Sequence, residues 1–140
     1  GVPILTSSLM QVSTVNTLLP DSKKAGILTI SKSTLSDAHL RAANVPSDTP
    51  IGTTEDGAEF SRVILNDELQ LNIELARMDN INAALEMKTD HPDLGAIILE
   101  CTNMSPYAEA IQEAVELPVF SIVNFVEWLH AGLKPRRFSS

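Results

Sequence analysis

Short runs of apolar residues alternate along the chain with longer segments in which apolar residues recur every three or four positions. The short runs predict four β-strands, at residues 2–6, 25–30, 96–99 and 118–122. The longer segments predict helices at residues 9–19, 34–43, 71–88, 105–115 and 124–131, and residues 50–53 and 58–65 are compatible with a further short strand and a helical turn. This alternation predicts one α/β domain over residues 1–140, a three-layer αβα fold with a mainly parallel four-stranded sheet.

Helix boundaries are predicted from capping patterns. Thr34 and Asp37 have the spacing of a capping box, and Ser105 precedes a proline that suits the first position of a helix. Gly132 is expected to end the last helix. On that helix the apolar side chains of Phe125, Trp128 and Leu129 are expected to face the core.

Composition narrows the possible functions. The chain has 140 residues, 44% of them apolar, and a net charge of −8, which disfavours nucleic acid as a partner. Polar residues interrupt every apolar stretch before it reaches the length of a membrane helix, so we expect a protein with no membrane association. The single cysteine excludes an internal disulfide and a cysteine-rich zinc site, and it suits a reducing cytoplasmic compartment.

Cys101 is the strongest candidate for a catalytic residue. It follows a strand predicted to be buried and precedes Ser105, the predicted helix start, by four residues. Ligands of parallel sheets bind at the carboxyl ends of strands, where helix N-termini favour a thiolate and a bound carboxylate. Thr102 and Asn103 add a hydroxyl and an amide beside it. From these residues alone, a small buried hydrophobic cysteine is the favoured interpretation.

A cysteine nucleophile of the protease type would need a histidine nearby. His39 falls inside a predicted helix, His91 lies at the opposite end of the strand before Cys101, and His130 ends the last helix. None of the three is expected to assist the thiol.

Three serines follow predicted strands and are candidates for substrate binding. Ser7 and Ser8 come after the first strand, and Ser31 comes after the second. Ser7 and Ser8 are alternatively explained as residues that start a helix.

Two segments strongly resemble the second lobe of the aspartate/glutamate racemase superfamily: Leu-Glu-Cys-Thr-Asn-Met-Ser-Pro-Tyr-Ala at residues 99–108 and Leu-Pro-Val-Phe-Ser-Ile at residues 117–122. Residues 2–9 look like the region that joins the two lobes of that family, and residues 26–29 like the strand that opens the second. The resemblance therefore covers nearly the whole chain.

The resemblance implies a two-lobe enzyme that works without a metal or an organic cofactor. Each lobe supplies one cysteine; one thiolate removes the α-proton of an amino acid and the opposing thiol returns a proton on the other face. Carried over to this sequence, Cys101 is one catalytic thiol and Thr102, with the backbone N–H groups of its turn, contacts the substrate carboxylate.

The sequence also departs from the family. Asn103 stands where the glutamate racemase branch has a histidine, and Glu100 where it has a small residue, so an aspartate/glutamate racemase-like branch is expected rather than a glutamate-specific one. No second cysteine is present, and the chain starts at Gly1 without a methionine. We therefore expect a C-terminal portion whose partner is an N-terminal lobe carrying the second cysteine.

Other functions remain open at this point. Hydantoin racemases, maleate isomerases and arylmalonate decarboxylases belong to the same superfamily and act on related carboxylates. A non-catalytic binding or interaction domain with a buried Cys101 is the alternative of a different class, and a homo-oligomer is a further possibility.

Overall fold

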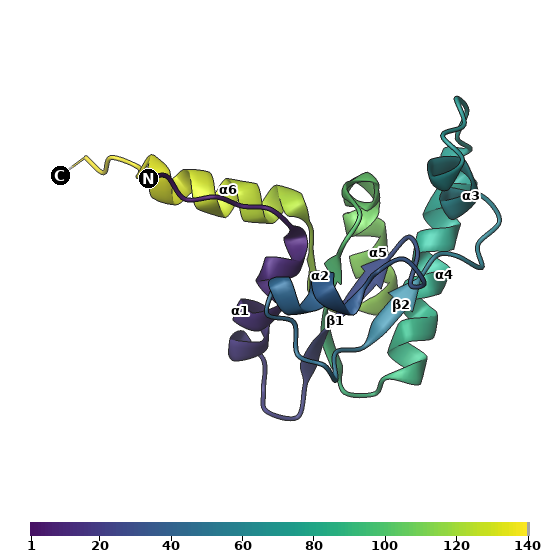
Figure 1. Ribbon diagram of the computed structural model, residues 1–140, viewed down its shortest axis with the longest axis horizontal. Coiled ribbons are helices and arrows are strands. Elements are labelled where there is room, and N and C mark those ends of the chain that lie inside the picture. Colours follow the sequence, from purple (N-terminus) through teal and green to yellow (C-terminus); the bar gives the residue numbers. More distant parts are fainter. Residues whose placement is uncertain (140) are drawn as a thin grey trace.

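The computed structural model describes residues 1–139, which form one parallel sheet with helices on both faces (Figure 1). The strands have the spatial order β2-β1-β3-β4, and their bounds are β1 Lys24–Thr29, β2 Ile51–Thr53, β3 Leu94–Leu99 and β4 Val119–Phe120. The α-helices are α1 Gln11–Leu18, α2 Asp37–Ala42, α3 Phe60–Leu65, α4 Ile73–Asp90, α5 Ala108–Val115 and α6 Ile122–Leu133. Two 3₁₀ helices, η1 Ser8–Met10 and η2 Thr102–Tyr107, precede α1 and α5.

The core consists of two apolar clusters, one on each face of the sheet. Ile27 and Ile98 face the cluster that α1 covers, whereas Leu28 and Leu99 face the cluster beneath α3, α4 and α5. The four side chains are essentially inaccessible to solvent, as expected for central parallel strands with helices on both faces. The predicted three-layer αβα fold is confirmed.

Glycines let α4 approach the sheet closely. A Cβ atom at Gly52 would lie 3.0 Å from Met87 Sδ, and one at Gly26 would also clash with the Met87 side chain. The absence of these side chains therefore allows Met87, which is buried, to pack directly on β1 and β2.

The prediction of a strand at residues 2–6 is wrong, and Ile51–Thr53 is the fourth strand instead. Ser8 Oγ donates a hydrogen bond of 2.7 Å to the Leu99 carbonyl, at the carboxyl end of β3. The preceding residues therefore run beyond the end of the sheet, where no strand edge is available, and Val2 and Ile4 are exposed.

Two predicted helix starts are also wrong. Ser36 caps α2 by accepting a hydrogen bond from His39 N, while Thr34 donates its hydroxyl to the Ser31 carbonyl. Ser105 caps no helix, because η2 begins earlier and Ser105 lies inside it.

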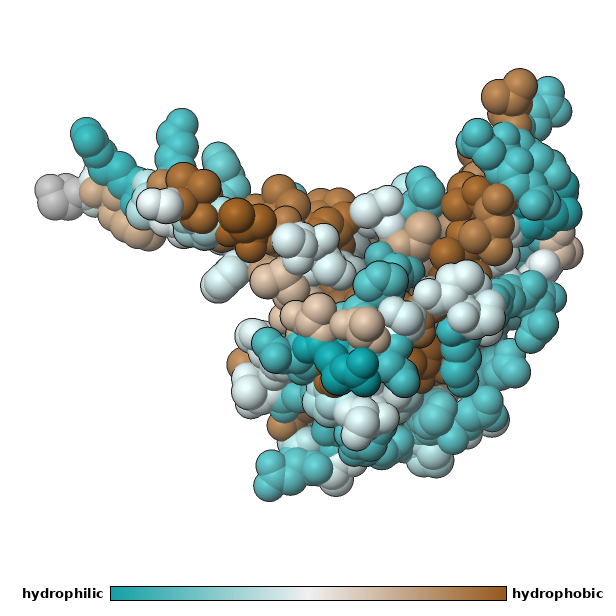
Figure 2. Space-filling view, viewed as in Figure 1, coloured by the Kyte–Doolittle hydropathy of each residue, from teal (hydrophilic) through white to brown (hydrophobic). Residues whose placement is uncertain are grey.

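Helix α6 differs most from its prediction. A capping box of Ser121 and Asn124 starts it, and it continues through Gly132 to Leu133. None of its residues is buried, and Trp128 is 69% exposed, so the expected core face is wrong. Figure 1 shows α6 projecting from the sheet, and Figure 2 shows hydrophobic atoms along it. Among the described helices, none is long and apolar enough to cross a membrane.

Candidate functional site

Cys101 lies two residues after the last residue of β3, Leu99, at the carboxyl end of a central strand of the sheet. It is partly exposed and packs against the apolar cluster beneath α4 and α5. The turn of η2 follows at once, with Met104 N donating to the Cys101 carbonyl at 3.0 Å. The thiol therefore stands at the strand-to-helix junction where parallel sheets bind ligands, as predicted.

Burial raises the pKa of the Cys101 thiol, and the negative charge of Glu100 raises it further. Hydrogen bonds from the backbone N–H groups of Asn103 and Met104, and from the Asn103 side chain, act in the opposite direction. The expectation that this turn favours a thiolate is wrong for the chain alone, because desolvation outweighs the N–H groups. The same groups are nevertheless the donors that a thiolate would require.

Thr102 and Asn103 form the start of η2, and both side chains are exposed. They lie beside Cys101 on an open surface, where a ligand would meet the hydroxyl, the amide and the first N–H groups of the turn together. A carboxylate is the ligand that such a set of donors suits.

Ser7 and Ser8 have different positions near the same edge. Ser8 is buried and its hydroxyl donates to the Leu99 carbonyl, so it positions the chain at the end of β3. Ser7 is only half-buried and accepts a hydrogen bond of 3.1 Å from Leu9 N. Of the two, Ser7 is open to a ligand.

Ser31 is buried after β1, and its hydroxyl donates to Glu55 Oε1 at 2.6 Å. Ser33 Oγ also donates to this oxygen, and the Lys32 N–H donates to the other. These donors hold the pKa of Glu55 below its usual range. The turn thus binds a carboxylate, as its residue types allow, but the carboxylate belongs to the chain itself.

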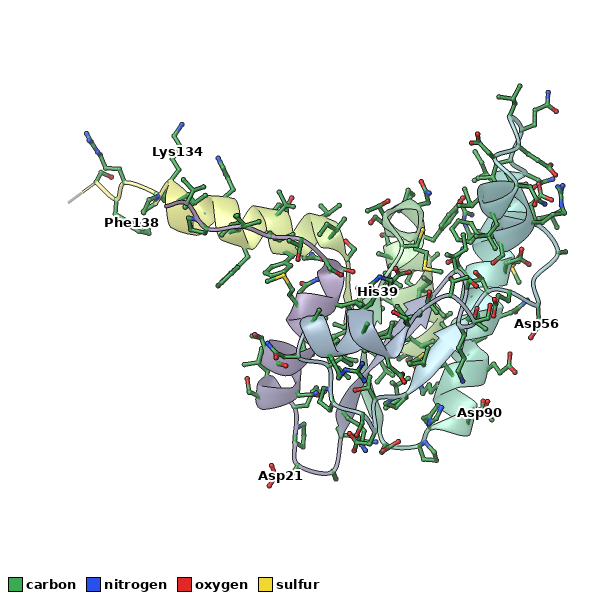
Figure 3. All side chains as sticks on the ribbon, viewed as in Figure 1. Asp21, His39, Asp56, Asp90, Lys134 and Phe138 are labelled. Carbon is green, nitrogen blue, oxygen red and sulfur yellow. The ribbon has the colours of Figure 1, made fainter. Side chains whose placement is uncertain are left out.

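A hollow of 330 Å³, here called the rim hollow, lies at the carboxyl end of the sheet on the side of α2. Its lining consists of Thr6, Ser7, Leu9, Leu35, His39, Ala42, Ala43 and Glu100. Glu100 Oε2 accepts a hydrogen bond of 3.0 Å from Thr29 Oγ1. Figure 3 labels His39 on α2 beside this region.

Glu55 and Thr29 are neighbours of the site that the sequence did not predict, and His39, which was expected to play no part, lines the rim hollow. Thr29 Oγ1 also accepts from Ser31 N at 3.3 Å, so a polar network runs from Glu100 through Thr29 and Ser31 to Glu55. Strand order brings these residues together, and no local motif marks them. The one available signal was the hydroxyl of Thr29, near the end of the predicted strand 25–30.

No known family profile matches the chain. Two curated relatives share short segments with it: 38% identity over 41 residues with dimethylsulfoniopropionate lyase 5 of Emiliania huxleyi, and 27% identity over 62 residues with dimethylsulfoniopropionate lyase of Durusdinium. These segments cover 29% and 44% of this chain, and 8% and 21% of the two lyases.

Among solved structures, allantoin racemase from Pseudomonas fluorescens is similar to this fold, with a TM-score of 0.57 and 14% sequence identity. The superposition covers 94% of this chain and 60% of that racemase. The fold is therefore racemase-like, which agrees in part with the resemblance found in the sequence. The chain spans less than two thirds of the length of each of these relatives.

Proposed function

We propose that this chain is the Cys101-bearing lobe of a cofactor-independent enzyme that removes the proton next to a carboxylate, with amino-acid racemisation of the aspartate/glutamate type as its reaction. One observation carries the proposal: the Cys101 thiol stands at the carboxyl end of a central parallel strand, with the N–H groups of Asn103 and Met104 beside its sulfur. The racemase-like fold supports it.

In the proposed reaction, the Cys101 thiolate accepts the substrate α-proton and the electrons of the C–H bond remain on carbon. A second acid then donates a proton to the opposite face, and the configuration is inverted. Thr102, Asn103 and the N–H groups of η2 bind the substrate carboxylate, into which the carbanion charge is delocalised. The raised pKa of Cys101 makes its thiolate a stronger base towards a carbon acid.

The second acid is proposed to come from another lobe, because the chain contains one cysteine. The superposition leaves 40% of the allantoin racemase chain without a counterpart here, given the 60% that is covered. Helix α6 supports a partner of this kind, since within the described residues it buries no side chain fully and leaves Val126, Trp128 and Leu133 exposed. The substrate would then be enclosed between two lobes.

Elimination by a dimethylsulfoniopropionate lyase is the second candidate, and both sequence relatives favour it by name. Here the Cys101 thiolate would take a proton from the carbon next to the carboxylate. The C–H electrons would form a C=C bond, and the C–S electrons would leave with sulfur as dimethyl sulfide, leaving acrylate. This reaction requires one base and no proton return to carbon, so a single thiol suffices.

Both candidates are tested with the full-length protein in deuterated water. Proton NMR measures α-proton exchange of aspartate, glutamate and other amino acids, and acrylate formation from dimethylsulfoniopropionate. We expect Cys101→Ser to lower the rate of whichever reaction the protein catalyses about 10³-fold, which is the range typical of a lost general base. Glu116→Gln, on the exposed left-handed residue that ends α5, is the control and retains full activity.

The product distinguishes the two reactions, since exchange without acrylate indicates racemisation and acrylate indicates elimination. Unchanged turnover in Cys101→Ser would refute both. Absence of both reactions in the full-length wild type would instead support a non-catalytic binding domain. The 140-residue chain alone is expected to racemise no substrate, because it lacks the second acid.

A further inference from the structure

Strand β2 forms one edge of the sheet and pairs with β1 on one side only. The Pro50 carbonyl and the Thr54 N–H, which flank the strand, form hydrogen bonds of 2.8 and 3.1 Å to backbone groups of β1. Because alternate residues of a strand point their backbone groups to opposite sides, those of Ile51 and Thr53 point to the open side. Both residues are partly exposed. The edge therefore offers N–H and C=O groups to one further strand.

A groove with an acidic lining runs along this edge, between β2 and α4. It consists of two hollows, of 140 and 300 Å³, that share Asp56 and Glu86 in their linings, and Asp90 lines the first. These three residues are exposed, and none of their carboxylates forms an ion pair among residues 1–139. Lys32 also lines the first hollow, so the carboxylates outnumber the cation. We call this lining the acidic groove.

The chain carries a basic arm at the other end of the molecule, in the residues that follow α6. Lys134, Arg136 and Arg137 are exposed, and within the described part of the chain they form no ion pair. Figure 3 labels Lys134 at the end of α6 and Asp90 on the far side of the fold. Helix α6 also points away from β2 and α4 (Figure 1). The arm is therefore placed to meet the acidic groove of another copy, not its own.

We propose that residues 136–138 of one copy add to the β2 edge of a second copy as a further strand, with the arginines at its acidic groove. Charge complementarity carries this choice of partner. The chain has a net charge of −8, and three of its ten lysines and arginines lie in the arm. Two copies therefore repel each other in most orientations and attract when the arm of one approaches the groove of the other.

The residue types of the arm suit an added strand. Its three residues match the three of β2, Ile51–Thr53. Successive side chains of a strand alternate between faces, so Arg137 lies on one face of the extended sheet and Arg136 and Phe138 lie on the other. Pro135 comes just before the pairing residues, where its missing N–H costs no ladder hydrogen bond. Main-chain pairing would thus supply affinity, and the charges would select the edge.

This contact is heterologous, because the arm of one copy meets a different surface on the next. It therefore joins copies head to tail. The contact uses neither Cys101 nor its turn, so it is independent of the proposed function.

Sedimentation velocity of the full-length protein over a range of concentrations tests the contact. We expect association that weakens as NaCl rises from about 50 to about 500 mM, because salt screens exposed charges. Arg136→Glu with Arg137→Glu, the arm variant, is expected to lower the association constant at least about tenfold. Glu86→Lys with Asp90→Lys, the groove variant, is expected to do the same.

An equimolar mixture of the two variants is expected to associate again. The acidic arm of the arm variant then meets the basic groove of the groove variant, and the unaltered arm and groove meet as in the wild type. Recovery in the mixture also shows that both variants are folded.

Arg41→Glu on α2 and Glu113→Lys on α5 are the controls, since both change exposed charges outside the arm and the acidic groove and leave association unchanged. A wild type that stays monomeric at every concentration overturns the inference. Association that survives salt and both variants overturns it as well. Two weakened variants whose mixture stays monomeric would show that the arm and the groove do not contact each other.

Discussion

The pKa of the Cys101 thiol is subject to opposing effects from two nearby residues, Glu100 and Asn103. Burial and the charge of Glu100 disfavour the thiolate, while the backbone N–H and side-chain amide of Asn103 favour it. Replacement of either neighbour therefore changes the pKa in a known direction. The two pKa shifts have opposite signs, so the two variants together test whether both residues act on the Cys101 thiol.

Alkylation by iodoacetamide measures this pKa, because the thiolate is the reacting form. We expect the rate to rise with pH to a midpoint above the 9.0 of an unperturbed thiol. Glu100→Gln lowers the midpoint by removing a repulsive charge, and Asn103→Ala raises it by removing a donor. A midpoint below 9.0 in the wild type, or shifts of the same sign in both variants, would contradict this description.

Residues of the site differ in how far sequence predicts them. Cys101, Thr102 and Asn103 are consecutive, so one turn places them and a motif is enough to find them. Ser31 meets Glu55, and Thr29 meets Glu100, across neighbouring strands. Such contacts depend on strand order and register, which the local pattern of residues does not contain.

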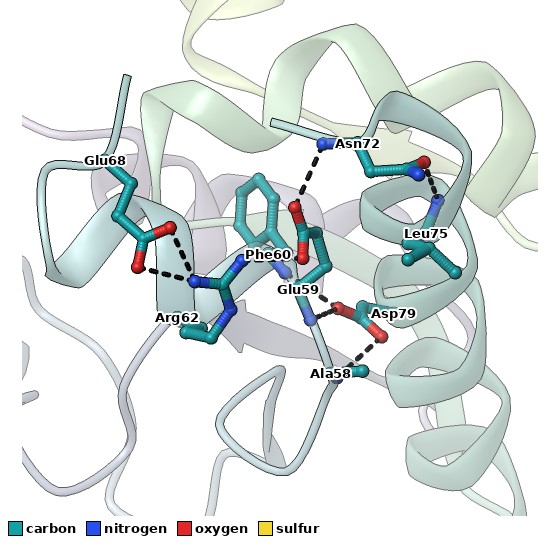
Figure 4. A network of polar contacts seen from close by, with 8 residues as sticks. All are labelled: Ala58, Glu59, Phe60, Arg62, Glu68, Asn72, Leu75 and Asp79. Carbon is teal, nitrogen blue, oxygen red and sulfur yellow. Dashed lines mark hydrogen bonds and ion pairs between the residues drawn. The ribbon is translucent and has the colours of Figure 1, made fainter. Parts of the chain in front are cut away.

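At the scale of elements, α3 depends on a carboxylate from another helix (Figure 4). Asp79 of α4 accepts hydrogen bonds from the N–H groups of Glu59 and Phe60, both at 2.7 Å, and from Ala58 N at 3.1 Å. These are the N–H groups at the start of α3, where no residue of the helix itself provides a side-chain cap. Asp79 is therefore the cap of α3.

We expect Asp79→Ala to lower the free energy of unfolding by on the order of 2 kcal/mol, because three N–H groups lose a charged acceptor. Urea denaturation followed by circular dichroism measures the change. Glu86→Ala, at an exposed position of the same helix, is the control and is expected to have little effect. A loss no greater than that of the control would show that α3 needs no cap from α4.

The predicted elements differ in accuracy for a physical reason. The central strands are buried on both faces, so their short apolar runs predict them well. Helix α4 is predicted as a helix, but it buries Ala83, Ala84 and Met87 and leaves the larger Leu75, Met78 and Leu85 exposed. Helix α6 has the same kind of periodicity but buries no residue. An amphipathic pattern indicates that a helix needs a partner, and it does not indicate that the partner is in the same chain.

At the scale of the whole molecule, α6 is attached to the rest of the fold at its first residues, and most of the helix beyond them is exposed. The Gln11 side chain donates to the Ser121 carbonyl at 3.0 Å, immediately before the helix. Beyond this point a groove of 500 Å³ separates α6 from α1, with Trp128 and Leu18 in its largely apolar lining. An exposed apolar groove on a chain with a net negative charge is expected to be covered in the assembled protein.

Trp128 is the single tryptophan of the chain, so its fluorescence reports whether this groove is covered. For the 140-residue chain at low concentration we expect the red-shifted emission and ready acrylamide quenching of an exposed indole. Association through the groove shifts the emission to the blue as concentration rises, and Leu18→Glu, at a position 75% exposed, suppresses that shift. Leu69→Glu, on the α3–α4 loop, does not. Blue-shifted emission at every concentration, unaffected by Leu18→Glu, would mean that the chain covers α6 itself; a blue shift only on adding a separately produced second lobe would identify that lobe as the partner.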